Sequence, residues 1–465
     1  MKEKEILFRT RIKRIHFIGI GGIGMSGIAE ILLDLGYEVT GSDLRRNDNI
    51  ERLLKKGCRV KIGHSPGAVE GSDVVVYSSA IRKDNVEIIK AVDMDIPVIP
   101  RAEMLAELMR FKDGIAVAGT HGKTTTTSLA STLLHQGGLD PTVVIGGKLN
   151  SLGSNARSGT GNLMLVEADE SDRSFLYLRP LINIVTNIDR EHMNSYKDMD
   201  DLKNSFMKFM SSIPFYGFNI VCIDNEMLRE VTEDVHRQII TYGFANHAHY
   251  RISDLKTENG LNKFRISTRE GELGVVATKM FGRHNALNCT AVVALGTELG
   301  MEFSQIQKAL LEFGGVDRRF TIKGVIGSVT VVDDYGHHPT EISATLSAAR
   351  QAYPDKKITA VFQPHRYSRV SSLFKDFAKA FYVADQLIVT EIYAAGEYPI
   401  NGITGKKLAE AAGNYGHPNS IYGGNLDEVL ELVVANAGEN EIILTLGAGT
   451  ITHLSKKIVE RLEAS

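Results

Sequence analysis

Short apolar runs alternate with segments of helical periodicity over about the first hundred residues of this chain. The apolar runs, each of which predicts a β-strand, are residues 14–20, 38–40, 74–77 and 97–99. Between them apolar residues recur at helical spacing, which predicts helices over residues 25–35 and 86–92, and a helix over residues 101–110 closes the unit. Strands and helices that alternate in this way predict a parallel sheet with helices on its faces.

The same alternation continues to the end of the chain. A second unit is predicted to contain strands at 114–118, 163–167, 182–188 and 218–223, helices at 123–136, 285–299 and 304–313, and a hairpin-like stretch at 248–279. A third unit has predicted strands at 328–333, 357–362, 386–390 and 441–446. Because 465 residues are too many for one hydrophobic core, we expect three consecutive α/β domains, over residues 1–110, 111–319 and 320–465.

Composition and charge exclude several classes of protein. Apolar residues make up 43% and charged residues 23% of the chain, as in soluble globular proteins, and the net charge of −3 disfavours nucleic acid as a partner. Residues 1–14 lack the apolar segment of a signal peptide, and no apolar run approaches the roughly 18 residues that span a membrane. The three cysteines, Cys58, Cys222 and Cys289, match no metal or redox motif. We expect a cytoplasmic protein with buried, reduced thiols and no membrane partner.

A glycine-rich loop follows the first predicted strand. The pattern G-x-G-x-x-G lies between that strand and a helix, and Asp43 ends the next strand. Glycines permit a tight turn and a close approach of the backbone to a diphosphate, which the amino end of the helix also attracts. The pattern favours a ligand site over a turn that binds nothing, and a nicotinamide cofactor and a UDP-sugar both fit it. The candidate binding residues are Gly19, Gly21, Gly22, Ile23, Gly24 and Asp43.

A second glycine-containing loop, G-T-H-G-K-T, lies between the strand and the helix that open the second unit. Val117 replaces the first glycine of the full phosphate-loop pattern, but Lys123 is placed to contact the β- and γ-phosphates and Thr124 to contact a magnesium ion. We therefore predict an ATP and Mg²⁺ site in a central domain of the P-loop ATPase type, between two Rossmann-like domains. Its candidate nucleotide-binding residues are Gly119, Thr120, His121, Gly122, Lys123, Thr124 and Thr125.

Metal ligands for this site are expected at the ends of neighbouring strands. The segment E-A-D-E-S-D begins at Glu167 directly after an apolar strand, and N-I-D-R-E-H ends another strand and supplies His192. Taken singly, Asp169, Glu170 or His192 is more often part of a solvated loop or a helix cap than a ligand. Two such clusters at the carboxyl edge of one sheet favour metal binding, because parallel strands end together there.

These motifs resemble those of the Mur ligases, which build the peptide of the bacterial cell wall. The resemblance rests on G-T-H-G-K-T, E-A-D-E-S-D and the later G-R-H-N-A-L-N of residues 282–288, and it runs from Ile15 to His453. Three further segments resemble the branch of the family that joins L-alanine to UDP-N-acetylmuramate: H-F-I-G-I-G-G-I-G-M-S at residues 16–26, D-D-Y-G-H-H-P at 333–339 and Q-P-H-R-Y-S-R at 363–369.

The resemblance implies a role for each motif. The first glycine loop, together with Ser79, would hold the uridine nucleotide sugar and not NAD. Glu167 and His192 would be further metal ligands beside Thr124. The adenine side of ATP would contact His284, Asn285 and Asn288.

The reaction that this implies needs an activated acyl group. The sugar's lactyl carboxylate would attack the γ-phosphate of ATP to give an acyl phosphate, which the amine of alanine then displaces. Clustered cations are expected where two anions meet. The third domain supplies candidates at two strand ends and at its seam: Arg319, Asp334, Tyr335, His337, His365, Arg366 and Arg369. We expect catalytic roles for Lys123, His192, His337 and Arg366, and substrate contacts from Asp334, Tyr335, His365 and Arg369. Arg319, at the seam, is expected to bind the cofactor by contacting phosphate, and its alternative role is to fix the hinge.

Three alternatives have some support in the sequence. An NAD-dependent oxidoreductase fits the first glycine loop but has no need of Lys123 and Glu167. A related ligase that attaches a tripeptide in wall recycling fits most motifs, although the G-I-G-G-I-G form of the first loop favours the alanine ligase. A non-catalytic nucleotide-binding protein is disfavoured because the phosphate and metal residues are intact. We expect small-molecule substrates and a monomer or weak homodimer.

Overall fold

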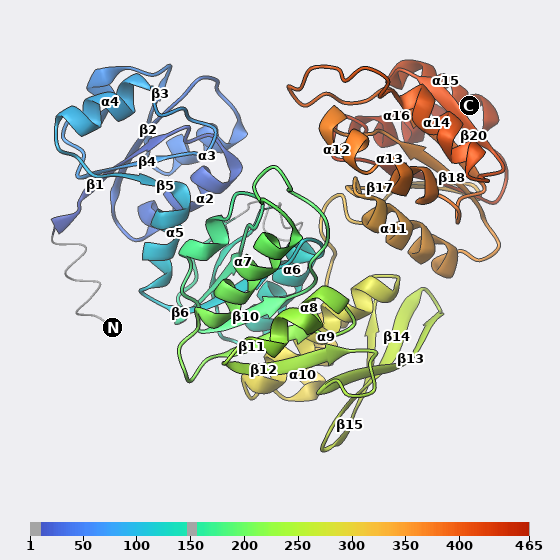
Figure 1. Cartoon of the computed structure of the whole chain (residues 1–465), viewed down its shortest axis with the longest axis horizontal. Helices are drawn as coiled ribbons and strands as arrows, with labels where there is room; N and C mark the ends of the chain where they lie inside the picture. The colour runs from blue at the N-terminus through green and yellow to red at the C-terminus, as the bar shows by residue number, and fades with distance from the viewer. Residues whose placement is uncertain (1–10, 147–155, 465) are drawn as a thin grey trace. The chain divides into compact units, whose positions relative to one another are not determined.

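The computed structural model describes residues 11–146 and 156–464 (Figure 1). Within these residues three β-sheets of five, ten and six strands follow one another along the sequence. By packing, the chain divides into two compact units. The first runs to Ser253 and adds Arg265–Val276 and Leu287–Gly314, and the second contains Asp254–Phe264, Ala277–Ala286 and the chain from Gly315 onward. Sheets that alternate with helices confirm the predicted α/β class.

The five-stranded sheet belongs to the first unit and is parallel throughout. Its order is β3-β2-β1-β4-β5, formed by β1 (Arg14–Ile18), β2 (Glu38–Asp43), β3 (Arg59–Ile62), β4 (Val74–Tyr77) and β5 (Val98–Pro100). The connecting helices are α2 (Ile23–Asp34), α3 (Asp48–Lys55), η1 (Pro66–Val69), α4 (Val86–Asp93) and α5 (Arg101–Met109). Ile15, Phe17 and Ile18 of the central β1 are fully buried. The strand order reverses beside β1, where α/β sheets form a ligand crevice.

The ten-stranded sheet has the order β15-β14-β13-β12-β11-β10-β6-β9-β7-β8. Its strands are β6 (Asp113–Ala118), β7 (Thr142–Val144), β8 (Ala156–Arg157), β9 (Leu163–Glu167), β10 (Ile182–Val185), β11 (Phe218–Cys222), β12 (Gln238–Gly243), β13 (Tyr250–Glu258), β14 (Leu261–Thr268) and β15 (Gly271–Thr278). Its helices are α6 (Lys123–Gln136), η2 (Ser174–Tyr177), α7 (Met199–Ser211), α8 (Glu226–Glu233), α9 (Arg283–Glu298) and α10 (Phe303–Glu312). β6 is parallel to both neighbours, β10 and β9, so the three strands end at one edge.

The six-stranded sheet of the second unit has the order β16-β17-β21-β18-β19-β20. Its first pair, β16 (Thr321–Ile326) and β17 (Val329–Asp334), is antiparallel, whereas β18 (Lys357–Phe362), β19 (Gln386–Thr390), β20 (Ser420–Gly424) and β21 (Glu441–Leu446) are parallel to their neighbours. The helices are α11 (Pro339–Ala352), α12 (Tyr367–Ser372), α13 (Phe374–Lys379), α14 (Gly405–Asn414), α15 (Leu426–Asn436) and α16 (Thr452–Glu463). Apolar clusters fill both faces of this sheet.

Two differences from the predicted elements have a clear physical reason. The hairpin-like stretch forms three strands, and its first turn is the pair Asn259-Gly260, both with positive φ, as a two-residue hairpin turn requires. The strands β3, β7, β8, β12, β16 and β20 were not predicted. Of these, β3, β16 and β20 lie at sheet edges with half-exposed patterns, so they lack the apolar run that marks a buried strand. The strands β7 and β8, of three and two residues, are too short to show a periodic pattern.

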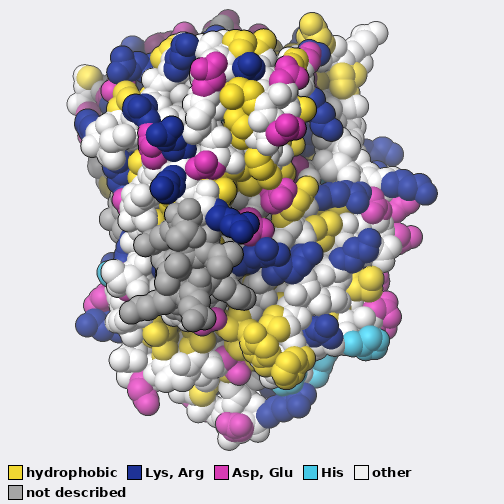
Figure 2. Space-filling view, turned by 90° about the vertical axis from the view of Figure 1, so that its left-hand side faces the viewer, with side chains coloured by type: hydrophobic (Ala, Val, Ile, Leu, Met, Phe, Trp, Pro, Cys, Tyr) yellow, Lys and Arg dark blue, Asp and Glu magenta, His cyan; other side chains and the backbone are white. Residues whose placement is uncertain are grey.

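The surface and the cysteines agree with the composition. Acidic and basic side chains are intermingled on the face shown in Figure 2. All three cysteines are buried thiols outside any disulfide, and burial raises the pKa of Cys58 to about 12. Among the described residues, no helix combines the length and apolarity that a membrane crossing needs.

Candidate functional site

The first glycine loop is fixed by the strand beside it. Gly19 has a φ of +79°, and its N–H and that of Ile20 donate to the carbonyl of Ser42 in β2, at 2.8 and 3.1 Å. The N–H of Gly21 donates to Asp43 Oδ2 at 2.8 Å. Asp43 therefore holds the shape of the loop with one carboxylate oxygen. Its predicted contact with a ligand stays a prediction.

The helix α2 begins at Ile23, directly after this loop. Gly22 precedes it and provides no side-chain cap, and no acidic residue lies in the first turn. The amino end of a helix with this composition attracts an anion such as a diphosphate. Ser79 is exposed two residues beyond the end of β4. A Cβ on Gly24 would lie 3.0 Å from a guanidinium nitrogen of Arg101, a neighbour of the loop that the sequence did not indicate.

The second glycine loop joins β6 to α6 and needs its glycines. Gly119 has a φ of +134° and Gly122 one of +82°. A Cβ on Gly119 would lie 2.1 Å from Thr186 Oγ1, and a Cβ on Gly122 would lie 2.8 Å from Asn288 Oδ1. The loop is thus pressed against the end of β10 on one side and against Asn288 on the other. Asn288 therefore lies beside the phosphate loop, and its predicted contact with adenine stays a prediction.

Polar residues after β10 clamp the loop by hydrogen bonds. Asn187 Oδ1 accepts from the N–H of His121 at 2.8 Å, and Thr186 Oγ1 and Asn187 Nδ2 donate to the carbonyl of His121 at 2.6 and 3.0 Å. The N–H of Asp189 donates to Thr120 Oγ1 at 2.9 Å, and Asp189 Oδ2 lies 2.9 Å from His121 Nε2. These roles of Thr186, Asn187 and Asp189 were missed, although polar residues directly after an apolar strand were the available signal.

Lys123 lies at the start of α6 in an almost fully buried ion pair. Its Nζ donates to the carbonyls of Gly119 and Thr120 at 2.6 and 3.1 Å and lies 2.9 and 2.8 Å from the two carboxylate oxygens of Glu170. Glu170 is 1% exposed. Burial raises the pKa of Glu170 to about 7 against the opposing charge of Lys123. Burial lowers the pKa of Lys123, but the carboxylates of Glu170, Glu167 and Asp169 outweigh it and raise that pKa, so the ammonium stays charged.

The residues predicted to bind magnesium divide into a close pair and a separate histidine. Thr124 Oγ1 donates to Glu167 Oε1 at 2.9 Å, and Glu167 Oε2 accepts from the N–H of Gly146 at 2.7 Å. A hydroxyl and a carboxylate that converge in this way are the oxygen donors that Mg²⁺ prefers. His192, whose φ is +58°, points its Nε2 at Glu170 Oε1, 3.6 Å away. The two clusters thus meet at one edge of the sheet, as predicted.

The other acidic residues of E-A-D-E-S-D shape the turn. Asp169 Oδ1 accepts from the N–H of Ser171, and Asp172 Oδ1 accepts from the N–H of Ser174, both at 2.9 Å. Burial raises the pKa of Asp169, but the hydrogen bond from Ser171 and the charges of Lys123 and Arg101 lower it further than burial raises it. The motif therefore presents Glu167 and Glu170 to the phosphate loop and uses its aspartates to fold the backbone.

In the second unit, the carboxyl end of β17 carries Asp334 and Tyr335. Asp334 is buried: Oδ2 accepts from the N–H of Phe320 at 2.8 Å, and Oδ1 accepts from the N–H of Gly336 at 2.7 Å and from Thr345 Oγ1 at 3.2 Å. Burial raises its pKa, although Arg319 opposes this. Asp334 thus anchors the loop, and its predicted contact with substrate stays a prediction.

Aromatic and basic side chains gather around this strand end. The guanidinium groups of Arg318 and Arg319 lie 4.9 and 5.0 Å from the ring centre of Tyr335. Arg319 also lies 3.7 Å from Glu341. His284 of the same unit is neutral at pH 7 because burial, with the charge of Arg319, lowers its pKa to about 4. Asn285 Nδ2 donates to the carbonyl of Phe281 at 2.8 Å.

The end of β18 carries the remaining predicted residues. His365 Nδ1 accepts a hydrogen bond from Arg369 at 3.0 Å, its ring stacks on Tyr393 at 5.5 Å, and the ring of His337 lies 6.0 Å away. Burial and the nearby cations lower the pKa of His365 to about 4. Arg366 is exposed and has a φ of +67°, which its N–H bond to the carbonyl of Tyr393 helps to hold. His337, His365 and Arg369 thus form one cluster, as strand-end neighbours were expected to.

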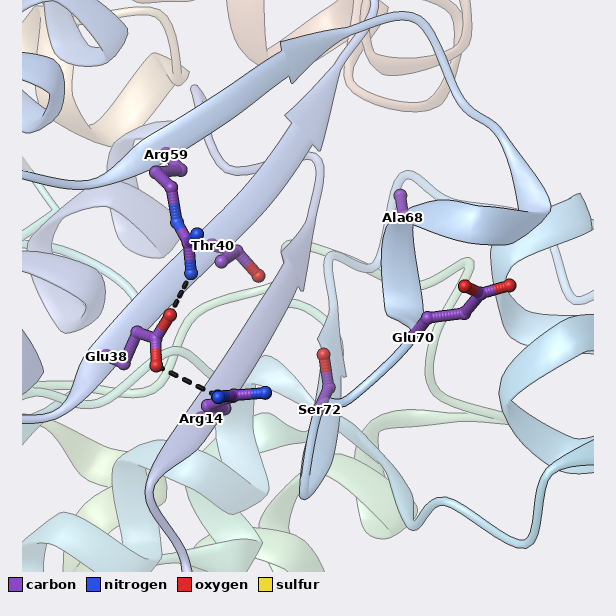
Figure 3. A pocket seen from close by; sticks show the side chains of 7 residues that line it. All are labelled: Arg14, Glu38, Thr40, Arg59, Ala68, Glu70 and Ser72. Atoms are coloured by element: carbon purple, nitrogen blue, oxygen red, sulfur yellow. Dashed lines mark hydrogen bonds and ion pairs between the residues drawn. The ribbon is translucent and has the colours of Figure 1, made fainter.

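A polar hollow of ≈ 340 Å³ lies elsewhere on the five-stranded sheet (Figure 3). Arg14, Glu38 and Arg59 begin β1, β2 and β3 and line it, and Glu38 forms ion pairs with both arginines. The first glycine loop follows the opposite, carboxyl end of β1. The hollow is therefore not part of the predicted nucleotide-sugar site.

Comparison with family models gives a match over most of the chain. Residues 14–113 match the Mur ligase family, catalytic domain; residues 117–296 match the Mur ligase middle domain; and residues 318–449 match the Mur ligase, glutamate ligase domain. These matches and the three sheets agree with the predicted three-domain architecture.

Individual relatives match nearly end to end. The chain is 50% identical over 452 residues to a UDP-N-acetylmuramate--L-alanine ligase of Geotalea daltonii, and the match covers 97% of this chain and 98% of that protein. A protein of the same name from Myxococcus xanthus is 48% identical over 99% of this chain and 97% of its own length. The solved UDP-N-acetylmuramate-alanine ligase of Thermotoga maritima superposes with a TM-score of 0.80 at 30% identity, over 97% of this chain and 99% of that one.

Proposed function

This chain belongs to the Mur ligase family, and we propose how its residues join L-alanine to UDP-N-acetylmuramate with the hydrolysis of ATP. The ligase activity accords with the full-length identity of about 50% to alanine ligases. The observation on which the residue roles rest is the phosphate loop itself: Lys123 and Thr124 begin a helix, and each contacts a carboxylate of E-A-D-E-S-D. An ATP-dependent ligase needs this arrangement, whereas an NAD-dependent oxidoreductase does not.

The phosphate loop is the proposed site of the ATP phosphates. Its backbone N–H groups and the amino end of α6 face the phosphates, and Lys123 exchanges part of its contact with Glu170 for the β- and γ-phosphates. Thr124, Glu167 and His192 are the residues that would hold Mg²⁺, which neutralises charge on the phosphoryl oxygens when it is bound. Asn288, which lies against Gly122, and His284 and Asn285 are the proposed adenine contacts.

The first half-reaction activates the sugar. One oxygen of the lactyl carboxylate attacks the γ-phosphorus, the bond to the β-phosphate oxygen breaks, and an acyl phosphate and ADP are formed. Lys123 stabilises the charge that develops on the transferred group, because its buried ammonium acts in a site of low dielectric. The uridine diphosphate is assigned to the first glycine loop and the amino end of α2, with Ser79 and Asp43 beside it.

The second half-reaction forms the amide. The amine of L-alanine attacks the acyl carbon, inorganic phosphate leaves, and the amine gives up a proton. We assign the alanine carboxylate to Arg366 and Arg369, since guanidinium groups suit a carboxylate. The pKa of His365 is lowered to about 4, so His365 is neutral at pH 7. Because the neutral ring accepts from Arg369 through Nδ1, His365 is assigned to holding that guanidinium. His337 is the proposed orienting group for the amine, with Tyr335, Asp334 and Arg319 holding the strand end in place.

The transfer of an oxygen isotope tests whether the lactyl carboxylate attacks the γ-phosphorus before the amide forms. With ¹⁸O in the lactyl carboxylate, one ¹⁸O atom should appear in each inorganic phosphate released, detected by mass spectrometry, because the acyl phosphate retains the attacking oxygen. Phosphate without the label would show that water and not the carboxylate attacks ATP. Lys123→Met provides the matched control, since the label should be transferred at a much lower rate but with the same stoichiometry.

The recycling ligase that attaches a tripeptide is a second candidate, and it is not favoured. The relatives at about 50% identity are alanine ligases, whereas the solved murein peptide ligase of Psychrobacter arcticus is 23% identical and shares the fold. The cytoplasmic location and the monomeric or weakly dimeric state stay predictions. Size-exclusion chromatography with light scattering tests the latter.

A further inference from the structure

A buried carboxylate lies beneath the first glycine loop. Glu87, in the first turn of α4, is 0% exposed, and Ser42 and His16 beside it are 0% and 1% exposed. None of these three side chains belongs to the ligand sites proposed for the reaction. An ionised carboxylate is retained in a protein interior only where hydrogen bonds offset its loss of hydration, so its partners show which parts of the domain it holds.

Four groups from three segments of the chain converge on this carboxylate. Ser42 Oγ donates to Oε2 at 2.6 Å and His16 Nε2 lies 3.2 Å from the same oxygen. The N–H of Ser65 donates to Oε1 at 2.9 Å, and His64 Nδ1 lies 3.7 Å from it. Burial raises the pKa of Glu87, but the hydrogen bonds from His16, Ser42 and Ser65 outweigh burial and lower it, so the group is ionised at pH 7.

Proton positions follow from this arrangement. Because an ionised carboxylate only accepts, the single hydroxyl proton of Ser42 is directed at Glu87. Ser42 Oγ can then only accept from His64 Nδ1, 3.0 Å away, so this nitrogen carries the proton. Thr40 Oγ1, 2.8 Å from His16 Nδ1, fixes the second histidine from its other side. The network therefore sets both the position of Ser42 and the tautomer of His64.

The network reaches the ligand site through the backbone of Ser42. The carbonyl of this residue accepts from the N–H groups of Gly19 and Ile20, at 2.8 and 3.1 Å, and thereby holds the start of the glycine loop. We propose that Glu87 is a positioning residue for the nucleotide sugar: it fixes Ser42 and His64, and through Ser42 the glycine loop, without touching the ligand. The proposal rests on the assignment of the nucleotide sugar to this loop.

The variant Glu87→Gln tests this because the amide has the same shape but only one oxygen. Its NH₂ group must face at least one of the donors that now point at the carboxylate. We expect the KM for UDP-N-acetylmuramate to rise by about 10-fold, with kcat and the KM values for ATP and L-alanine within about 2-fold of wild type. Ser42→Ala removes the hydroxyl link and should act in the same direction. The double variant should be no worse than the worse single one, because the two side chains act in series.

Glu38→Gln is the matched control. Glu38 is another carboxylate of the same domain, and it pairs with Arg14 and Arg59 where β1, β2 and β3 begin, at the opposite edge of the sheet from the glycine loop. This variant should keep the KM for the nucleotide sugar within about 2-fold of wild type. The proposal is overturned if Glu87→Gln leaves that KM unchanged, or if Glu38→Gln raises it equally. Should Glu87→Gln not fold, Ser42→Ala decides by the same criteria. A wild-type enzyme that does not use UDP-N-acetylmuramate would instead refute the proposed function.

Discussion

Replacing Gly119 by alanine tests whether close packing of the phosphate loop against β10 sets the rate. A Cβ at this position would lie 2.1 Å from Thr186 Oγ1 and 3.1 Å from the backbone N and O of Asn187. Ordinary contacts begin at 3.4 Å, so either the Thr186 hydroxyl turns away and loses its hydrogen bond to the carbonyl of His121, or the loop and the strand end separate by up to about 1.3 Å (3.4 − 2.1). A displacement of about 1 Å at reacting groups costs about 100-fold in rate. We expect kcat to fall by about that factor, or about 3 kcal/mol in the barrier.

The assay is steady-state phosphate release, with thermal unfolding followed in parallel. Gly138→Ala is the matched control, because Gly138 also has a positive φ, of +78°, but a Cβ added there would meet no neighbouring atom within 4 Å. That variant should lose about 1–2 kcal/mol of stability from backbone strain and keep its kcat within about 2-fold. Wild-type kcat in Gly119→Ala would show that the close packing of the loop against β10 does not set the rate. An equal loss of kcat in Gly138→Ala would assign the effect to strain and not to displacement.

Three further predictions concern the same loop. Lys123→Met should lower kcat by about 10²–10³-fold. Because this variant leaves the buried carboxylate of Glu170 without its charge partner, adding Glu170→Gln should restore stability in urea titrations but not the rate. The pKa of Glu170 is raised from 4.5 to about 7, so between these pH values its carboxyl group is more protonated in the folded state than in the unfolded state. The stability of the fold should therefore fall as pH rises through this window. Glu170→Gln should flatten that part of the plot of urea midpoint against pH. Thr124→Val should raise the Mg²⁺ concentration for half-maximal activity by about 10-fold with the KM for L-alanine unchanged, and an unchanged Mg²⁺ requirement would contradict the ligand role of Thr124.

The parts of the fold that the sequence predicts are those with a strong local pattern. The strands β9, β18, β19 and β21 and the helix α6 have the predicted bounds, because buried parallel strands are continuous apolar runs and α6 begins at a recognisable loop. The edge strands β3, β16 and β20 lack such a run. Their existence depends on pairing with a neighbour distant in sequence, which a local pattern does not contain.

The same distinction holds for the site. Lys123 and Thr124 are predicted because the chemistry of a phosphate loop is carried by six consecutive residues. The clamp by Thr186 and Asn187 and the ion pair with Glu170 join residues that lie 47 to 66 positions apart. Those partners are determined by the order β10-β6-β9, and the sequence shows only that polar residues follow each strand.

The ligase function is tested most directly by phosphate release from ATP in the presence of UDP-N-acetylmuramate, with L-alanine, glycine, L-serine or a tripeptide as the amine and mass spectrometry of the product. We expect turnover that depends on L-alanine and a product heavier by one alanyl unit. Turnover with the tripeptide alone would keep the ligase mechanism and contradict the assignment of substrate. Phosphate release that no amine stimulates, with no new amide in the product, would contradict the ligase function itself.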